Sequence, residues 1–171
     1  MKRIAVLCIL FLSIASMQAQ DKIKWMTMNE ALAAQEKSPK KILIDFYTDW
    51  CGWCKKLDKD IYEDKEFIKY INKNFYAVKF DAEGTEEVNY KGNTYTNPGY
   101  QEGRRRNSTH QLAQYFRVSG YPNTVFLNDD GSVLNQVPGY LKPKDFKMVL
   151  EYFYTDAFKT QTWAQFTQGK Q

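Results

Sequence analysis

Two cysteines separated by two residues are the part of this sequence best suited to chemistry. They stand in the segment Trp50-Cys51-Gly52-Trp53-Cys54-Lys55. Disulfide exchange needs a thiolate that attacks and a second thiol close enough to resolve the mixed disulfide. A helix that begins at Cys51 would place both sulfur atoms on one face, and its N-terminus would favour a thiolate on Cys51. The pair is therefore predicted to be a redox-active disulfide, with Cys54 as the more buried, resolving thiol.

Such a pair of cysteines could instead bind zinc or form a purely structural disulfide. A structural zinc site needs four ligands, whereas the chain has one histidine, His110, and no second cysteine pair. A purely structural disulfide would close a loop so short that it would add little stability. Redox chemistry is the better interpretation, and neither a metal nor a cofactor is expected.

The first residues have the pattern of a secretory signal peptide. Lys2 and Arg3 form a positively charged start, an uncharged and mainly apolar stretch follows, and Ala19 offers a small residue at the cut. Residues 1–19 are therefore expected to direct export to the periplasm or the exterior, leaving residues 20–171 as one domain. An uncleaved anchor is the alternative, but the apolar run is shorter than the roughly 20 residues that a membrane helix needs.

Charge argues against a nucleic-acid partner. The formal net charge is +4, and removing Lys2 and Arg3 with the signal peptide would leave about +2, which is too balanced to indicate phosphate binding. The one strongly basic run is Arg104-Arg105-Arg106, which we expect to be a solvated loop. Aromatic residues make up 16% of the chain, enough to fill a core and still contribute to a recognition surface.

The elements that must position the cysteines alternate between strands and helices. Strands are expected at residues 23–25, 41–48, 75–81, 124–127 and 133–137, and helices at 27–37, from the cysteines through 61, at 65–74, at 109–117 and from Pro143 onward. The strand at 41–48 is almost continuously apolar, as in a strand buried on both faces. The segment Asn128-Asp129-Asp130-Gly131 predicts a hairpin turn. This order predicts an α/β sandwich with a central mixed sheet flanked by helices.

Two motifs far apart in the chain resemble the thioredoxin superfamily. Residues 44–55, which contain the cysteine pair, resemble its active-site segment, and Gly120-Tyr121-Pro122-Asn123-Thr124 resembles its cis-proline loop. Within the superfamily, the chain is similar to exported bacterial thioredoxin-like proteins and to the C-terminal thioredoxin-like domain of transmembrane thiol:disulfide interchange reductases. The resemblance runs from about residue 25 to about residue 153. It implies a thioredoxin fold and a thiol:disulfide oxidoreductase.

The resemblance also implies roles for individual residues. Cys51 matches the nucleophile and Cys54 the resolving cysteine. Asp45 matches a buried acid behind the pair, whose pKa burial raises, so that it can take the proton from Cys54. A paired, purely structural carboxylate is the alternative for Asp45. A lysine that commonly neighbours this acid is not evident, because counting back from Asp81 places Ala77 there, with Lys79 on the same strand.

Four further residues are expected to contact the substrate. Pro122 matches the cis-proline, and Tyr121 before it would offer backbone hydrogen bonds to a bound peptide. Trp50 matches a surface tryptophan beside the site, although it could equally be a packing aromatic. Trp53 stands where thioredoxin has proline and disulfide isomerases have histidine. Without an imidazolium in the motif, a strong oxidant is disfavoured.

Two segments depart from the family pattern. Residues 84–107 interrupt the resemblance and contain a predicted hairpin, and the tail after Asp156 is a C-terminal extension. The tyrosine-rich and arginine-rich insert would either select the partner or cover an exposed sheet edge.

The leading functional hypothesis is an exported, monomeric dithiol reductant or exchange protein that acts on protein thiols and disulfides. It would need an electron donor, for which a membrane reductase is one candidate. A disulfide oxidant or isomerase is the first alternative. A thioredoxin-fold module that only binds a partner is the second.

Overall fold

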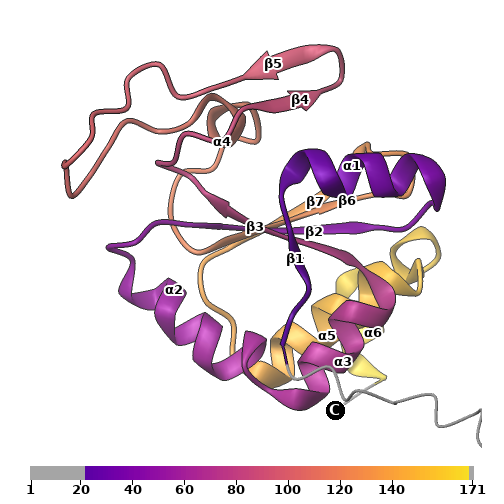
Figure 1. Cartoon of the computed structure of the whole chain (residues 1–171). Helices are drawn as coiled ribbons and strands as arrows, with labels where there is room; N and C mark the ends of the chain where they lie inside the picture. Colours follow the sequence, from indigo (N-terminus) through magenta and orange to yellow (C-terminus); the bar gives the residue numbers. More distant parts are fainter. Residues whose placement is uncertain (1–21, 170–171) are drawn as a thin grey trace, which may run out of the picture.

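The computed structural model describes residues 22–169, so the expected signal peptide at residues 1–19 lies outside the described residues. Within the described part, a central sheet has the strand order β1-β3-β2-β6-β7 (Figure 1). Its strands are β1 (Trp25–Met26), β2 (Ile42–Tyr47), β3 (Tyr76–Asp81), β6 (Asn123–Leu127) and β7 (Val133–Pro138). β1 and β2 run parallel to β3, whereas β6 is antiparallel to β2 and to β7. The expected central mixed sheet is confirmed.

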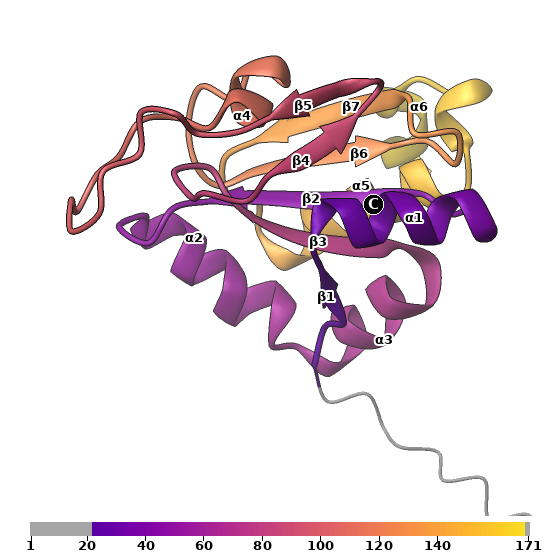
Figure 2. The same cartoon turned by 45° about the horizontal axis from the view of Figure 1, so that its top comes forward.

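Helices cover both faces of this sheet (Figures 1 and 2). One face carries α1 (Met28–Lys37) and α4 (Gln111–Tyr115). The other face carries α2 (Gly52–Leu57), α3 (Lys65–Asn74), α5 (Pro143–Tyr154) and α6 (Trp163–Gln168). None of the helices in residues 22–169 is long and apolar enough to cross a membrane.

Local signals explain where the helices begin. Thr27 caps α1 in a reciprocal capping box with Glu30, which satisfies two otherwise unpaired backbone N–H groups. Asp64 caps α3 through the N–H groups of residues 66 and 67. Pro143 occupies the first turn of α5, where its missing N–H costs nothing.

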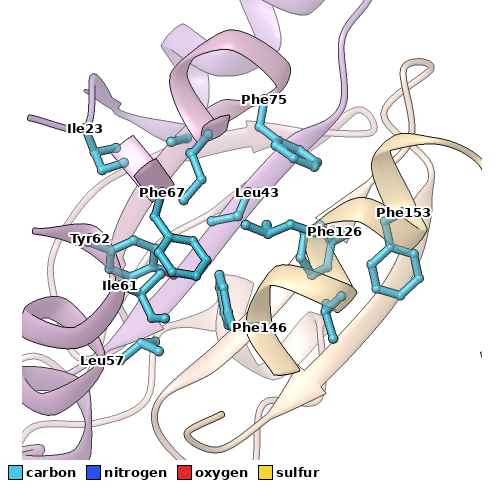
Figure 3. Packing of buried hydrophobic residues seen from close by; sticks show 14 of the residues in the cluster. Ile23, Leu43, Leu57, Ile61, Tyr62, Phe67, Phe75, Phe126, Phe146 and Phe153 are labelled. Atoms are coloured by element: carbon cyan, nitrogen blue, oxygen red, sulfur yellow. The ribbon is translucent and has the colours of Figure 1, made fainter. Parts of the chain in front are cut away.

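The apolar run of β2 is buried because both of its faces are covered. Leu43 faces the α3 and α5 side, where Phe67, Phe126 and Phe146 gather around it (Figure 3). Ile42 and Ile44 face the opposite side and pack with residues of α1 and α4. This two-sided burial is the arrangement that the strand's composition predicts.

The helix after the cysteines differs from its predicted form. It does not continue as one α-helix through residue 61, because α2 gives way to a π-helical turn, η1 (Asp58–Tyr62). A π turn inserts one additional residue and shifts the following side chains around the axis. Ile61 and Tyr62, although adjacent in sequence, are consequently both buried.

The insert contains the expected hairpin, formed by β4 (Val88–Tyr90) and β5 (Asn93–Tyr95). These two strands form a sheet of their own and pair with no strand of the central sheet, so the insert does not extend that sheet. Instead, Val88 and Tyr90 are buried in the core on the α1 and α4 side, and the Tyr90 hydroxyl donates to the Gly131 carbonyl at 2.7 Å. The hairpin is therefore part of the folded core.

We expect Tyr90→Ala to lower the free energy of unfolding by about 3–5 kcal/mol, because it opens a cavity beside Phe116 and removes a hydrogen bond. Urea denaturation would measure this. Thr94→Ala on the exposed strand β5 is the control, and we expect it to change stability by less than about 0.5–1 kcal/mol. Equal, small effects of both substitutions would show that the hairpin is not part of the core.

The C-terminal extension also packs against the domain. After the single 3-10 turn η2 (Ala157–Lys159), α6 places Phe166 and Trp163 against Tyr152 of α5, with ring centroids 5.0 and 5.2 Å away. The extension therefore packs against α5.

Candidate redox site

The cysteine pair lies where β2 passes into α2, as the sequence predicts. Cys51 is the N-cap residue of α2, and its Sγ accepts a hydrogen bond from the Cys54 N–H at 3.0 Å. The two cysteines are joined by a disulfide. Cys51 is 4% exposed and Cys54 is 1% exposed, which is the expected order. After reduction, the N–H groups at the helix start would stabilise a thiolate on Cys51.

The cis-proline motif lies at the same end of the sheet as the cysteines. The Tyr121–Pro122 peptide bond is cis, as the resemblance implied. Phe46 of β2 pairs with Asn123 of β6, so the segment before β6 lies beside the segment after β2. The rings of Trp50 and Tyr121 meet edge to face at 5.9 Å. Trp50 and Tyr121 thus form one rim of the site.

Trp53 and Tyr140 form a second rim of the site, and the sequence alone does not indicate the role of Tyr140. Trp53 is 59% exposed, and its ring lies 5.5 Å from that of Tyr140. The Tyr140 hydroxyl donates to Asp60 Oδ2, which also pairs with Lys56 at 2.8 Å. These contacts place the ring of Tyr140 beside that of Trp53, so that the two rings form one aromatic surface. Tyr140 has no distinguishing motif, and only tertiary contacts identify it.

An ion pair that contains a buried acid links β2, β3 and the end of α2. Asp45 is fully buried and accepts a hydrogen bond from Lys79 Nζ at 2.6 Å. Lys79 also pairs with Asp58, which follows Cys54 by one helical turn. The expectation that the acid has no clear lysine neighbour is wrong, because Lys79 fills that place and Ala77 does not. The parallel register of β2 and β3 sets Asp45 directly beside Lys79, and counting along one strand cannot reveal this.

The buried acid faces the same side of the sheet as Cys54. Asp45 follows Leu43 by two residues on β2, so both side chains point toward the α2 side. On the helical segment, Cys54, Leu57 and Ile61 are buried, and the last two pack in the same cluster as Leu43. Cys54 and Asp45 are therefore turned toward the same layer between sheet and helix.

Burial makes Asp45 an unusually weak acid. It raises the pKa of Asp45 from 3.8 to about 6, against the opposing effect of Lys79. Within residues 22–169 its Oδ1 atom has no hydrogen-bond partner. A carboxyl group with a pKa near neutrality and one unpaired oxygen atom is suited to accepting a proton.

The single histidine lies away from the cysteine pair in a structural position. His110 is buried before α4, where Nδ1 accepts from the Leu112 N–H and Nε2 lies 2.7 Å from the Glu86 carbonyl. Burial lowers the pKa of His110. Across residues 22–169, no group of three or more His, Cys, Asp or Glu side chains is placed to hold a metal ion.

Comparison with known proteins gives a consistent result. A family model described as a thioredoxin-like domain matches residues 28–154. The chain is 25% identical over 117 residues to the disulfide bond reductase DsbH of Chlamydia pneumoniae, covering 68% of this chain and 63% of that protein. It is 23% identical over 119 residues to the thiol:disulfide interchange protein DsbD of Pseudoalteromonas atlantica, covering 68% of this chain and 17% of that protein.

The chain thus spans less than two thirds of the length of both relatives. Among solved structures, a thioredoxin-fold protein from Helicobacter pylori superposes with a TM-score of 0.59 at 21% identity. That superposition covers 90% of this chain and 89% of the other. The two structures have the same fold.

Proposed function

Because the chain belongs to the thioredoxin-like family, we propose that it is a thiol:disulfide oxidoreductase that reduces disulfides in other proteins. The observation that carries this proposal is the Cys51–Cys54 disulfide at the start of α2, at the same end of the sheet as the cis-proline loop and with a buried acid on the preceding strand β2. Each of these parts has a place in disulfide exchange. The match to the family model over residues 28–154 includes all of them.

The reaction transfers two electrons from the cysteine pair to the substrate. The Cys51 thiolate attacks one sulfur of the substrate disulfide, forming a mixed disulfide and releasing the other substrate sulfur as a thiolate. Cys54 then passes its proton to Asp45 and attacks Cys51 Sγ. This step breaks the mixed disulfide, forms the Cys51–Cys54 disulfide and releases the second substrate sulfur as a thiolate, to which the proton held by Asp45 can pass. An external dithiol donor must reduce that disulfide before the next cycle.

Two observations support a reductant over an oxidant. The motif holds Trp53 and no histidine between the cysteines, so a source of thiolate stabilisation used by strong oxidants is missing. The relative from Chlamydia pneumoniae is named as a disulfide bond reductase. We further propose that residues 1–19 direct export and that a membrane protein reduces the Cys51–Cys54 disulfide again. The signal-peptide pattern of residues 1–19 supports export, and the similarity to thiol:disulfide interchange proteins supports a membrane partner.

The reduction potential tests the direction of the reaction. We expect a value below roughly −230 mV, nearer to thioredoxin than to strongly oxidising disulfides. Equilibration of the full chain with defined mixtures of reduced and oxidised glutathione or dithiothreitol, followed by thiol alkylation and mass measurement, would give it. A potential above roughly −180 mV would instead favour an oxidant or isomerase.

A further inference from the structure

The part of the insert beyond the hairpin forms a loop that is anchored to the end of β3. We call residues 97–108, which reach one residue past the insert, the insert loop. The Asn97 side chain, which is 8% exposed, donates to the carbonyls of Glu83, Gly84 and Ser108 at 2.8–3.2 Å. The Ser108 hydroxyl donates back to Asn97 Oδ1 at 2.6 Å. Both ends of the loop are therefore fixed to the segment that follows β3.

One carboxylate joins this loop to the rim of the redox site. Glu83 Oε2 accepts hydrogen bonds from the Trp50 indole N–H at 3.0 Å and from the Asn107 N–H at 2.8 Å. The guanidinium of Arg106 lies 4.3 Å from the centre of the Trp50 ring, within the range of a cation–π contact. Because Trp50 directly precedes Cys51, the loop extends the rim of the redox site.

The loop itself carries net positive charge. It contains three arginines and one acidic residue, Glu102, for a net charge of +2 (3 − 1). Arg104 and Arg105 are exposed. Across the described residues, none of the arginines of the loop lies in an ion pair with a carboxylate. An arginine fork on an already ordered loop binds carboxylates at a low entropic cost.

We propose that the insert loop is a docking surface for an acidic segment of the protein whose disulfide is presented to Cys51, an inference that rests on the proposed function. Arg104 and Arg105 would pair with carboxylates of that segment, and the exposed side chain of Tyr100 would add contact area. A nucleic acid fits less well, because a charge of +2 supports few phosphate contacts and a nucleic acid brings no disulfide to the cysteine pair.

Two synthetic peptides test this proposal. Each contains one cysteine in a disulfide with 2-mercaptoethanol, and they differ only in having glutamate or glutamine residues on one side. With the reduced full chain at low salt, we expect the acidic peptide to react about five to ten times faster. At about 0.5 M NaCl, the ratio of the rate with the acidic peptide to the rate with the glutamine peptide should approach one, because salt screens exposed charges. For the double variant Arg104→Glu/Arg105→Glu, we expect the ratio at low salt to fall below one.

The control variant is Lys65→Glu/Lys69→Glu, which makes the same charge change on exposed positions of α3, far from the insert in Figure 1. We expect it to keep the preference of the parent protein. If both double variants lose the preference equally, the effect is one of net charge and the proposal is overturned. An unchanged preference in the arginine variant overturns it as well.

Two small disulfides separate this inference from its alternatives. Oxidised glutathione carries carboxylates but no extended segment, so we expect its rate to change less than about twofold in the arginine variant. If the arginine variant lost as much rate with oxidised glutathione as with the acidic peptide, the loop would bind any nearby carboxylate. That result overturns docking of a protein segment. If the parent protein cannot reduce 2-hydroxyethyl disulfide at all, the proposed function itself fails. If it reduces this compound but shows no preference between the peptides, only the present inference fails.

Discussion

Cys51→Ser is expected to abolish the reduction of insulin disulfides, lowering the rate by at least about a thousandfold. The variant lacks the N-cap thiol of α2, where a thiolate is stabilised. Cys54→Ser should also stop turnover, but at the next step. Its Cys51 still attacks, and no second thiol resolves the product. Mixed disulfides should therefore accumulate, and non-reducing electrophoresis with mass spectrometry would detect them.

The two variants serve as controls for each other, because they make the same chemical change three residues apart. Mixed disulfides should form with Cys54→Ser and be absent with Cys51→Ser. Proteins trapped by Cys54→Ser in a cell extract would identify the substrates. If iodoacetamide alkylates Cys54 before Cys51 in the reduced parent protein, the two roles are reversed and the assignment is wrong.

Asp45→Asn is expected to leave the protein folded, to become more stable relative to the parent as the pH rises, and to slow its reaction. The pKa of Asp45 in the folded state, about 6, lies above the ordinary value of 3.8, so the folded state binds this proton more tightly than the unfolded state does. The resulting stabilisation is fully present below pH 3.8 and is lost as the pH rises through about 6. Asparagine does not titrate. Relative to the parent, the free energy of unfolding of the variant should therefore increase by about 3 kcal/mol between pH 3.8 and pH 7.5.

The kinetic effect follows from the loss of a proton acceptor. At each pH from 6 to 9, we expect Asp45→Asn to turn over a disulfide substrate at least about ten times more slowly than the parent protein does. Asp58→Asn is the matched control, because Asp58 shares Lys79 but is 36% exposed. This control should change stability by less than about 1 kcal/mol. Urea denaturation across the pH range and stopped-flow kinetics would measure both effects. Rates that are unchanged in Asp45→Asn would leave Asp45 with a structural role alone.

Much of the architecture follows from interactions between near neighbours in the chain. The start of α1 depends on Thr27 and Glu30, the start of α5 on Pro143, and the turn between β6 and β7 on Gly131, whose φ is +73°. Likewise, a helix that begins at Cys51 is enough to bring the sulfur atoms of Cys51 and Cys54 together. These features were predictable because their physical causes lie within a few residues of each other.

The surroundings of the cysteine pair depend instead on contacts between distant segments. The sequence alone showed an acid inside a strand, but only the register of two parallel strands sets Asp45 beside Lys79. In the same way, no local pattern connects Glu83 with Trp50 and Asn107, or Tyr140 with Trp53. Sequence determined which residues could exchange disulfides and which elements would carry them. Tertiary structure decided which charges and rings surround them, because those contacts arise only when strands and loops far apart in the chain pack together.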